Sequence, residues 1–248
     1  MAAKDRQPKG LDIRRYTSIP SVIDTLRRRQ LSLLDPQYWD DKNDSYFMRL
    51  YKEYRGVKGL YAMCAAMCPE TYHHWRIFTG TGNGGACIVL RRNLVEAYLR
   101  DVKMPTGEKV RFDEVEYLKL PEAKKLGPKD VKRLPFLKRV GFVDEDEYRI
   151  VIESSKDQRG AYQVDCPLEW IERVYLNPWL PESVADSVIN TLLELPGCAD
   201  LDIKHSRLID STTWKKAGDR VAGKKTGQQL KLSAQPRKRA TGGRSKAR

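Results

Sequence analysis

Two carboxylates stand two residues apart at the start of an apolar, β-prone run. They are Glu145 and Glu147, followed at the same spacing by Arg149. Because side chains alternate along a strand, these three point to one face, and Tyr148 and Ile150 point to the other. Paired acids at the mouth of a strand can hold sugar hydroxyls and stabilise a developing positive charge, so Glu145 and Glu147 are candidate catalytic residues. Taken by itself, the pattern is more typical of a solvated strand face with a surface ion pair.

A second candidate lies near the N-terminus, where Arg15 stands at the end of a predicted strand and Ser18 precedes a predicted helix. An arginine at the end of a strand can bind a phosphate through two N–H donors. A serine in this place suits the N-cap of a helix. Taken alone, Arg15 is more typical of an exposed cation or of one partner in a structural ion pair.

Aromatic residues precede a glycine-rich stretch in the middle of the chain. Trp75 and Phe78 follow two histidines, and glycines stand at several positions of 79–85. This stretch lacks the Gly-Lys-Ser/Thr of a P-loop and leads into a predicted strand, so it indicates a turn rather than a phosphate loop. Trp75 suits either the core or a stacking platform for a ligand.

Cys64 and Cys68 have the spacing of zinc ligands and are followed by His73 and His74. Cys64, however, lies in an apolar run where small buried cysteines are ordinary, so we expect no metal. A nucleophilic pair formed by Cys64 or Cys87 with His74 stays open.

The elements that must position these residues are predicted in groups rather than in strict alternation, which favours an α+β fold with a mixed or antiparallel sheet flanked by helices. An Asn-Gly pair at 83–84 predicts a hairpin, and Asn93 with Glu96 predicts a capped helix start. The predicted strands are 11–16, 31–34, 60–64, 86–90, 109–118, 147–153, 161–165, 171–175 and 201–209. The first predicted helix begins near Pro20. The others span 46–54, 72–76, 94–100, 121–139 and 181–195.

The charge of the chain is concentrated at one end. Residues 215–248 contain twelve Lys and Arg against one Asp, so the other 214 residues carry only the remaining +2 of the net +13. We expect a flexible N-terminus (1–10), one domain (11–214) and a disordered basic tail (215–248). The tail is predicted to contact nucleic acid without sequence specificity, through residues such as Arg237, Lys238, Arg239, Arg244 and Lys246.

Other compositional features limit the class of protein. No apolar run approaches the roughly 20 residues that cross a bilayer, so no membrane partner is expected. The charged first ten residues do not read as a secretory signal, and five cysteines do not suggest a disulfide framework. The expected location is therefore the cytoplasm.

In order and spacing, several short motifs resemble the bacterial domain-of-unknown-function family numbered twenty-nine seventy-one. They are Arg15-Tyr16-Thr17-Ser18, Asn43-Asp44, the strand with Cys64, Trp75 before Phe78, and Glu145-x-Glu147-x-Arg149. The resemblance covers roughly residues 11–214. Members of that family read Asn-Asp-Pro-Phe, Cys-Phe-Ser and a Tyr where this chain has Asn43-Asp44-Ser45-Tyr46, Cys64-Ala65-Ala66 and Phe78.

A more distant similarity is to ADP-ribosyltransferases, which begin with a strand carrying an Arg or His and end with a strand entered through Glu-x-Glu. That resemblance implies an NAD-binding enzyme. Arg15 would bind the pyrophosphate with Ser18 nearby, Trp75 or Phe78 would stack on nicotinamide, Glu147 would hold the ribose, and Glu145 would orient the acceptor. The alternative is a non-catalytic nucleic-acid-binding accessory protein that acts through its tail. A metal-dependent nuclease, based on Asp40, Asp41 and Asp44, has little support.

Overall fold

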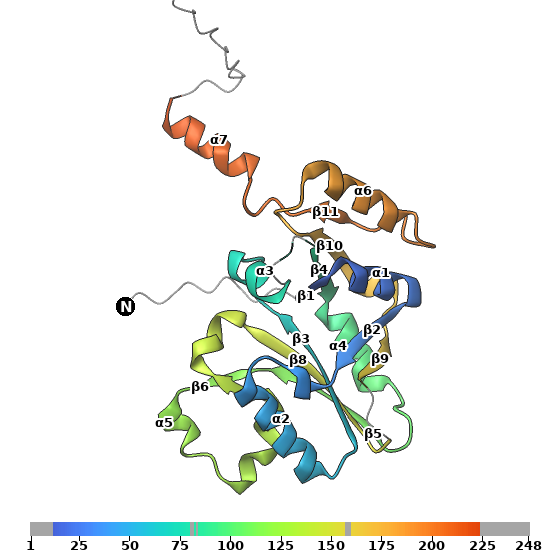
Figure 1. The fold of residues 1–248 in the computed structure, drawn as a ribbon, viewed down its shortest axis with the longest axis vertical. Helices are drawn as coiled ribbons and strands as arrows, with labels where there is room; N and C mark the ends of the chain where they lie inside the picture. The colour runs from blue at the N-terminus through green and yellow to red at the C-terminus, as the bar shows by residue number, and fades with distance from the viewer. Residues whose placement is uncertain (1–11, 80–81, 83, 157–159, 224–248) are drawn as a thin grey trace, which may run out of the picture. The chain divides into compact units, whose positions relative to one another are not determined.

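The computed structural model describes residues 12–79, 82, 84–156 and 160–223, and the chain divides into two units, Met1–Ile209 and Asp210–Arg248. The first unit is built on a nine-stranded sheet with helices against it (Figure 1). Along the sheet the strands follow the order β11-β10-β4-β1-β3-β2-β9, and β8 pairs with both β3 and β5. Most pairs are antiparallel and β10–β11 is parallel, which confirms the predicted α+β class with a mixed sheet.

The strands of this sheet are short, and every residue of β8 is buried. They are β1 (Asp12–Ser18), β2 (Gln30–Leu34), β3 (Gly59–Ala66), β4 (Gly85–Arg91), β5 (Glu108–Glu114), β8 (Glu147–Ser154), β9 (Ala161–Asp165), β10 (Ile171–Leu176) and β11 (Ile203–His205). A separate parallel pair is formed by β6 (Glu116–Leu118) and β7 (Leu137–Arg139).

Helices pack on both faces of the sheet. The larger core lies under α1 (Ile19–Arg28), α4 (Arg92–Asp101) and α6 (Glu182–Leu193), which bury residues such as Val22, Val95 and Leu192 against it. The opposite face is covered by α2 (Lys42–Arg55) and α3 (Tyr72–Phe78). The candidate chemistry of the sequence falls on this second face.

Local signals in the sequence fix the starts of the helices. Ser18 caps α1, Asp41 caps α2 and Thr71 caps α3, each accepting a hydrogen bond from a backbone N–H of the first turn. In α2 the buried residues Asp44, Met48 and Tyr51 follow at intervals of four and three, so one stripe of the helix faces the sheet.

Residues 115–146, called here the cover segment, leave the sheet at the end of β5 and return at the start of β8. Because β5 and β8 are paired directly, the cover segment is in effect a very long hairpin loop. It contains β6, α5 (Leu120–Ala123), β7 and two 3₁₀ helices, Pro128–Phe136 and Val140–Glu145. The first of these 3₁₀ helices packs on α2, and Figure 1 shows α2, α5 and β6 on one side of β8.

Three predictions of local structure are wrong. The hairpin predicted ahead of β4 is absent from the described residues, because the element before β4 is the helix α3 and β4 pairs with β1 and β10. Residues 121–139 do not form a long helix, since Pro128 and Pro135 confine them to short turns. Asn93 lies inside α4 rather than at its cap, and Glu96 instead binds Arg92 and Arg100. The last strand, predicted over 201–209, spans only Ile203–His205.

In the second unit, α7 (Thr212–Val221) begins after Ser211, whose side chain accepts a hydrogen bond from the backbone of Trp214. Disorder was expected from residue 215, and the structure differs because helix α7 continues to Val221.

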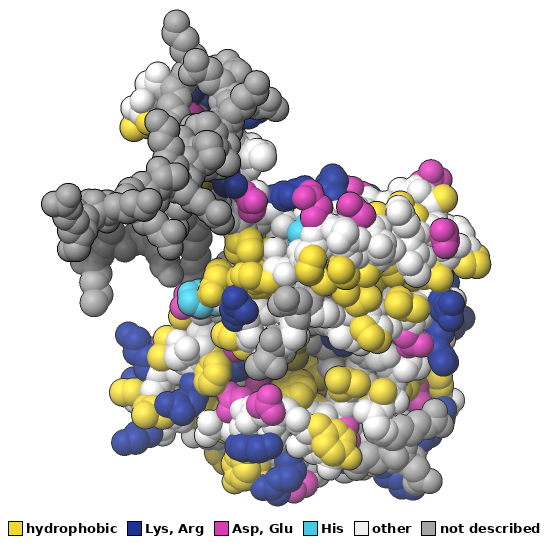
Figure 2. Space-filling model, turned by 45° about the horizontal axis from the view of Figure 1, so that its top comes forward, with side chains coloured by type: hydrophobic (Ala, Val, Ile, Leu, Met, Phe, Trp, Pro, Cys, Tyr) yellow, Lys and Arg dark blue, Asp and Glu magenta, His cyan; other side chains and the backbone are white. Residues whose placement is uncertain are grey.

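On the face in Figure 2, cationic and anionic side chains are interspersed, which agrees with the near-neutral net charge of residues 1–214. Within the described residues, no helix has the length and apolar character to span a bilayer.

Candidate functional site

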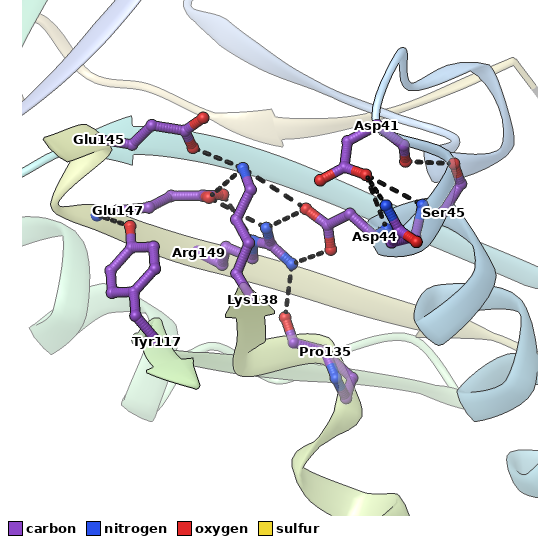
Figure 3. A network of polar contacts seen from close by, with 10 residues as sticks. Asp41, Asp44, Ser45, Tyr117, Pro135, Lys138, Glu145, Glu147 and Arg149 are labelled. Carbon is purple, nitrogen blue, oxygen red and sulfur yellow. Dashed lines mark hydrogen bonds and ion pairs between the residues drawn. The ribbon is translucent and has the colours of Figure 1, made fainter. Parts of the chain in front are cut away.

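A buried ion network lies where β8 begins (Figure 3). The guanidinium of Arg149 is fully buried, and its Nε lies 2.5 Å from Glu147 Oε1. Arg149 Nη1 donates to Asp44 Oδ1 on α2 at 2.8 Å and to the carbonyl of Pro135 at 3.0 Å. The interpretation of this strand face as solvated is therefore wrong, because α2 and the cover segment shield it from water.

Lys138, on β7, joins the two candidate catalytic acids. Its ammonium lies 2.5 Å from Glu145 Oε2, 3.1 Å from Glu147 Oε2 and 3.6 Å from Asp44 Oδ2. Figure 3 shows the ammonium between the three carboxylates. All four side chains keep less than 15% of their surface exposed, so these interactions are screened little by solvent.

The environment separates the acid strengths of the two glutamates. Burial raises the pKa of Glu145 to about 7, against the opposing effect of Lys138. Burial also acts to raise the pKa of Glu147, but Arg149 and Lys138 outweigh it and hold that pKa well below its usual range. A hydrogen bond links the two carboxyl groups. Near neutral pH the pair therefore combines a fixed carboxylate with an acid that can give up or accept a proton.

With all its groups ionised, the network holds one more negative charge than positive charge. Asp44, Glu145 and Glu147 are three acids, and Lys138 and Arg149 are two permanent cations. Burial raises the pKa of Asp44 as well as that of Glu145. The excess charge is thus met either by one proton on the acids or by a cation brought from outside.

Two further groups fix Glu147 in place. Its backbone N–H donates to the hydroxyl of Tyr117 at 2.9 Å. The thiol of Cys64 donates to its carboxylate from the neighbouring strand β3. Glu147 is therefore held at both its backbone and its side chain, which preorganises the carboxylate for binding.

On β1, the arginine that faces these acids is Arg14. The strand register pairs Arg14 with Ala66, and Ala66 with Glu147. Paired residues of antiparallel strands point to the same face, so Arg14, Ala66 and Glu147 lie in one row across the same face of the sheet. Two strand spacings separate their backbones by about 10 Å.

Arg15, which the sequence analysis favoured, alternates to the other face. It is paired with Ile88, a residue of the larger core, and its Nη2 donates to the carbonyl of Ser32 on β2 at 3.1 Å. Burial lowers the pKa of Arg15. The resemblance to ADP-ribosyltransferases implied that Arg15 binds the same ligand as the two acids. The register does not support this, because the arginine of β1 on the face of Glu147 is Arg14.

The two aromatic candidates, Trp75 and Phe78, both lie on α3 but differ in access. Trp75 is fully buried against the edge of the Tyr16 ring, and its Nε1 donates to Glu70, so its ring faces are not open to a ligand. Phe78 is 41% exposed and lies beside Tyr16 and His74. Phe78 is therefore the more accessible of the two predicted stacking residues.

His74 connects this aromatic cluster to the acids. Its Nε2 bonds to the carbonyl of Glu145 at 3.1 Å, and its Nδ1 contacts the hydroxyl of Thr71. A carbonyl only accepts, so Nε2 carries the proton, and burial lowers the pKa of His74. The nearest thiol to the ring is that of Cys68, 3.8 Å from Nε2, rather than Cys64 or Cys87.

The remaining candidates fall elsewhere. Ser18 caps α1, where its hydroxyl accepts a hydrogen bond from the N–H of Ser21. The predicted nucleic-acid-binding residues of the tail lie outside the described residues; these are Arg237, Lys238, Arg239, Arg244 and Lys246. Among the residues that the structure describes, no group of three or more His, Cys, Asp or Glu is placed to hold a metal ion.

The sequence analysis missed two residues of the site and gave a third another role. Lys138 was hidden in a stretch expected to be a basic helix, and nothing in its neighbours marks it. Asp44 was named in a family motif and as a possible nuclease acid, but not as a partner of Arg149, although it shares the apolar stripe of α2 with Met48 and Tyr51. Arg14 could have been preferred to Arg15 only with the register of β1 in hand.

Comparisons with known proteins give a distant result. No protein-family model matches the chain, so the resemblance to family twenty-nine seventy-one is not confirmed, and no curated protein matches it. Among solved structures, the chain is similar to Thermus sp. 2.9 DarT in complex with NAD+, at 12% identity and a TM-score of 0.40 over 81% of this chain and 97% of that one. It is also similar to Thermus sp. 2.9 DarT in complex with ADP-ribosylated ssDNA, at 14% identity and a TM-score of 0.41 over 83% and 98%. At this level the similarity assigns no family, residue or activity to this chain.

Proposed function

We propose that the chain is an ADP-ribosyltransferase-like enzyme that cleaves NAD and transfers its ADP-ribose to a macromolecular acceptor. The observation that carries the proposal is the pair Glu145 and Glu147, which share the ammonium of Lys138 and differ in acid strength, with Arg14 in the same row of the sheet as Glu147. A pair of this kind suits a reaction in which positive charge develops on a sugar carbon and a proton leaves the acceptor.

In this proposal each acid has its own role. Glu147 stays ionised, hydrogen-bonds the nicotinamide ribose and stabilises the positive charge as the glycosidic bond breaks. Glu145, at the entrance of the strand, accepts the proton of the attacking acceptor group because its raised pKa lies near neutral pH. Phe78 is the residue proposed to stack on the nicotinamide ring.

The anionic part of NAD needs a cation at some distance from the ribose. Arg14 is half-buried, and its Nη1 donates to the carbonyl of Cys68 at 3.2 Å. A guanidinium has five N–H donors, so Arg14 keeps donors for a pyrophosphate. The backbones of Arg14 and Glu147 are about 10 Å apart along the row. This separation suits a ligand with its sugar at one end and its phosphates at the other.

The direct experiment incubates the purified full chain with NAD and measures release of nicotinamide, with and without protein and oligonucleotide acceptors. We expect Glu147→Gln to lower the rate by on the order of a hundredfold or more, because the side chain loses its charge and keeps its shape. Glu116→Gln is the matched control, since Glu116 is an exposed acid of the cover segment that pairs with Arg133. Near-UV circular dichroism checks that each variant is folded.

Two results would contradict the proposal. One is a wild-type chain that consumes no NAD with any acceptor. The other is a Glu147→Gln variant, folded by circular dichroism, that retains the wild-type rate.

A second function, nucleic-acid binding through the tail, is favoured by the charge of residues 224–248, which contain nine Lys and Arg and no acid. Such a segment binds phosphates with release of counterions, so affinity falls steeply with salt. We expect a chain ending at Gly223 to lose most of its affinity for single-stranded and duplex oligonucleotides, measured by fluorescence anisotropy over a salt series. Unchanged affinity would assign binding to the folded part. The two functions are compatible, because the tail can hold the acceptor.

A further inference from the structure

Lys138 is not needed to neutralise Asp44 and Glu147, the two most buried carboxylates of the cluster. Arg149 already contacts both Asp44 and Glu147, with two hydrogen bonds to each. Lys138 adds a second cation to both, and it is also the cation that contacts Glu145. Its ammonium therefore lies at the point where the three acids converge.

The attachment of Lys138 allows the ammonium to leave that point. It is borne on β7, a three-residue strand that pairs with β6 inside the cover segment rather than with the main sheet. A lysine has four rotatable bonds and a compact charge, whereas Arg149 is fixed by its fork of donors and by the ring of Trp39, 4.9 Å from its guanidinium carbon. Arg149 thus forms the permanent part of the network and Lys138 the exchangeable part.

The charge balance of the cluster indicates which kind of ligand group can take the place of the Lys138 ammonium. With Lys138 withdrawn, the cluster holds three acids and one cation, and Glu145 and Glu147 face a single unfilled position. A ligand atom that carries positive charge fits that position, whereas a neutral one leaves Glu145 without a cation and the cluster with two uncompensated negative charges.

We propose that Lys138 determines specificity: in the free protein its ammonium occupies the place of the ligand's positive charge, and the site admits a ligand whose reacting end is cationic enough to displace it. The inference rests on the proposed function, in which that end is the nicotinamide ring. NAD carries this charge, and its reduced form NADH has nearly the same shape without the charge.

The test compares dissociation constants of NAD and NADH by isothermal titration calorimetry on the full chain. Lys138→Met removes the competing cation and keeps the length of the side chain. We expect it to tighten NAD binding on the order of tenfold and to leave NADH binding unchanged. Lys138→Arg keeps a cation and should resemble the wild type. Lys129→Met, an exposed lysine of the same segment, is the control for loss of charge alone.

A second measurement uses the unaltered chain and so does not depend on the folding of a variant. The charges of Glu147 and Glu145 outweigh burial and raise the pKa of Lys138 above its usual value, which suppresses its nucleophilicity. Displacement removes that effect. We expect NAD, and not NADH, to increase acetylation of Lys138 by acetic anhydride, measured by mass spectrometry.

The outcomes separate the two proposals. Equal changes in NAD and NADH affinity in Lys138→Met, or no change in either, would overturn the role of Lys138 while leaving the proposed function in place. Acetylation of Lys138 that NAD leaves unchanged or lowers would overturn it as well. A wild-type chain and variants that all fail to bind NAD would overturn the proposed function together with the inference.

Discussion

The thiol of Cys64 donates a hydrogen bond to the carboxylate of Glu147, from the strand position directly opposite Arg149. Burial raises the pKa of this thiol well above its usual value, and the charge of Glu147 adds to the effect. Cys64 therefore stays neutral and acts as a donor rather than as a nucleophile.

A first prediction follows for cysteine reactivity. In the folded protein at pH 8 we expect Cys64 and Cys87 to resist iodoacetamide, because burial raises the pKa of both thiols, and to react fully once urea unfolds the chain. Peptide mass spectrometry after native labelling measures this. Rapid labelling of Cys64 in the folded state would show that its thiolate is accessible, and would reopen a nucleophilic role.

A second prediction concerns the ion pair between α2 and β8. Asp44→Asn leaves the guanidinium of Arg149 buried with one of its two carboxylate partners gone. We expect the free energy of unfolding to fall by about 3–5 kcal/mol, as for other broken buried pairs. Asp41→Asn, at the N-cap of the same helix, should cost less than about 1 kcal/mol, because asparagine caps well. Urea unfolding of both variants decides the matter, and equal costs would contradict the prediction.

A third prediction concerns pH. Glu145 has a pKa of about 7 in the folded chain against 4.5 as its usual value, so between these pH values the folded state holds a proton that the unfolded state has released. The free energy of unfolding of the wild type therefore loses this contribution as pH rises from 4.5 to 7. Glu145→Gln has no carboxyl group at this position, so its free energy of unfolding lacks this fall between pH 4.5 and 7.

Relative to the wild type, Glu145→Gln should thus gain stability on the order of 3 kcal/mol between pH 4.5 and 8. Urea titrations across that range measure the difference. Glu116→Gln, an exposed acid, controls for loss of a carboxylate. A difference between Glu145→Gln and wild type that stays constant with pH would mean that Glu145 titrates as in the unfolded chain.

A fourth prediction distinguishes the two neighbouring arginines. Arg15→Met replaces a half-buried cation, whose one hydrogen bond in the described part of the chain goes to the carbonyl of Ser32, with an apolar side chain. We expect it to keep or raise stability by about 1 kcal/mol and to leave NAD affinity unchanged. Arg14→Met should instead weaken NAD binding by on the order of tenfold or more. Calorimetry on both variants tests the pair, and the reverse pattern would return the role to Arg15.

Much of the sheet could be predicted because its strands carry local signals. The run from Tyr148 to Glu153 and the serine cap at Ser18 indicated β8 and α1 within a residue or two. The two acids were recognised from their spacing. Their burial was not, because it depends on α2 and on the cover segment, and neither the stripe containing Asp44 nor the position of Lys138 is local to β8.

The errors have a common physical origin. In the 121–139 stretch, charge and occasional apolar residues favoured a helix, but Pro128 and Pro135 limit it to 3₁₀ turns. At β4, the Asn-Gly pair favoured a local hairpin, whereas the strand pairs with β1 and β10 from distant parts of the chain. Pairings of long sequence separation are set by packing and cannot be predicted from nearby residues.

The cover segment leaves and rejoins the sheet at adjacent ends of two paired strands, so a short turn could replace it without changing the order of the strands. It nevertheless supplies Lys138, Tyr117 and the Pro135 carbonyl to the acids. The surroundings of Glu147 are therefore set in part by a segment that takes no part in the pairing of the main sheet. Its sequence can change without altering the register that positions the strand bearing Glu147.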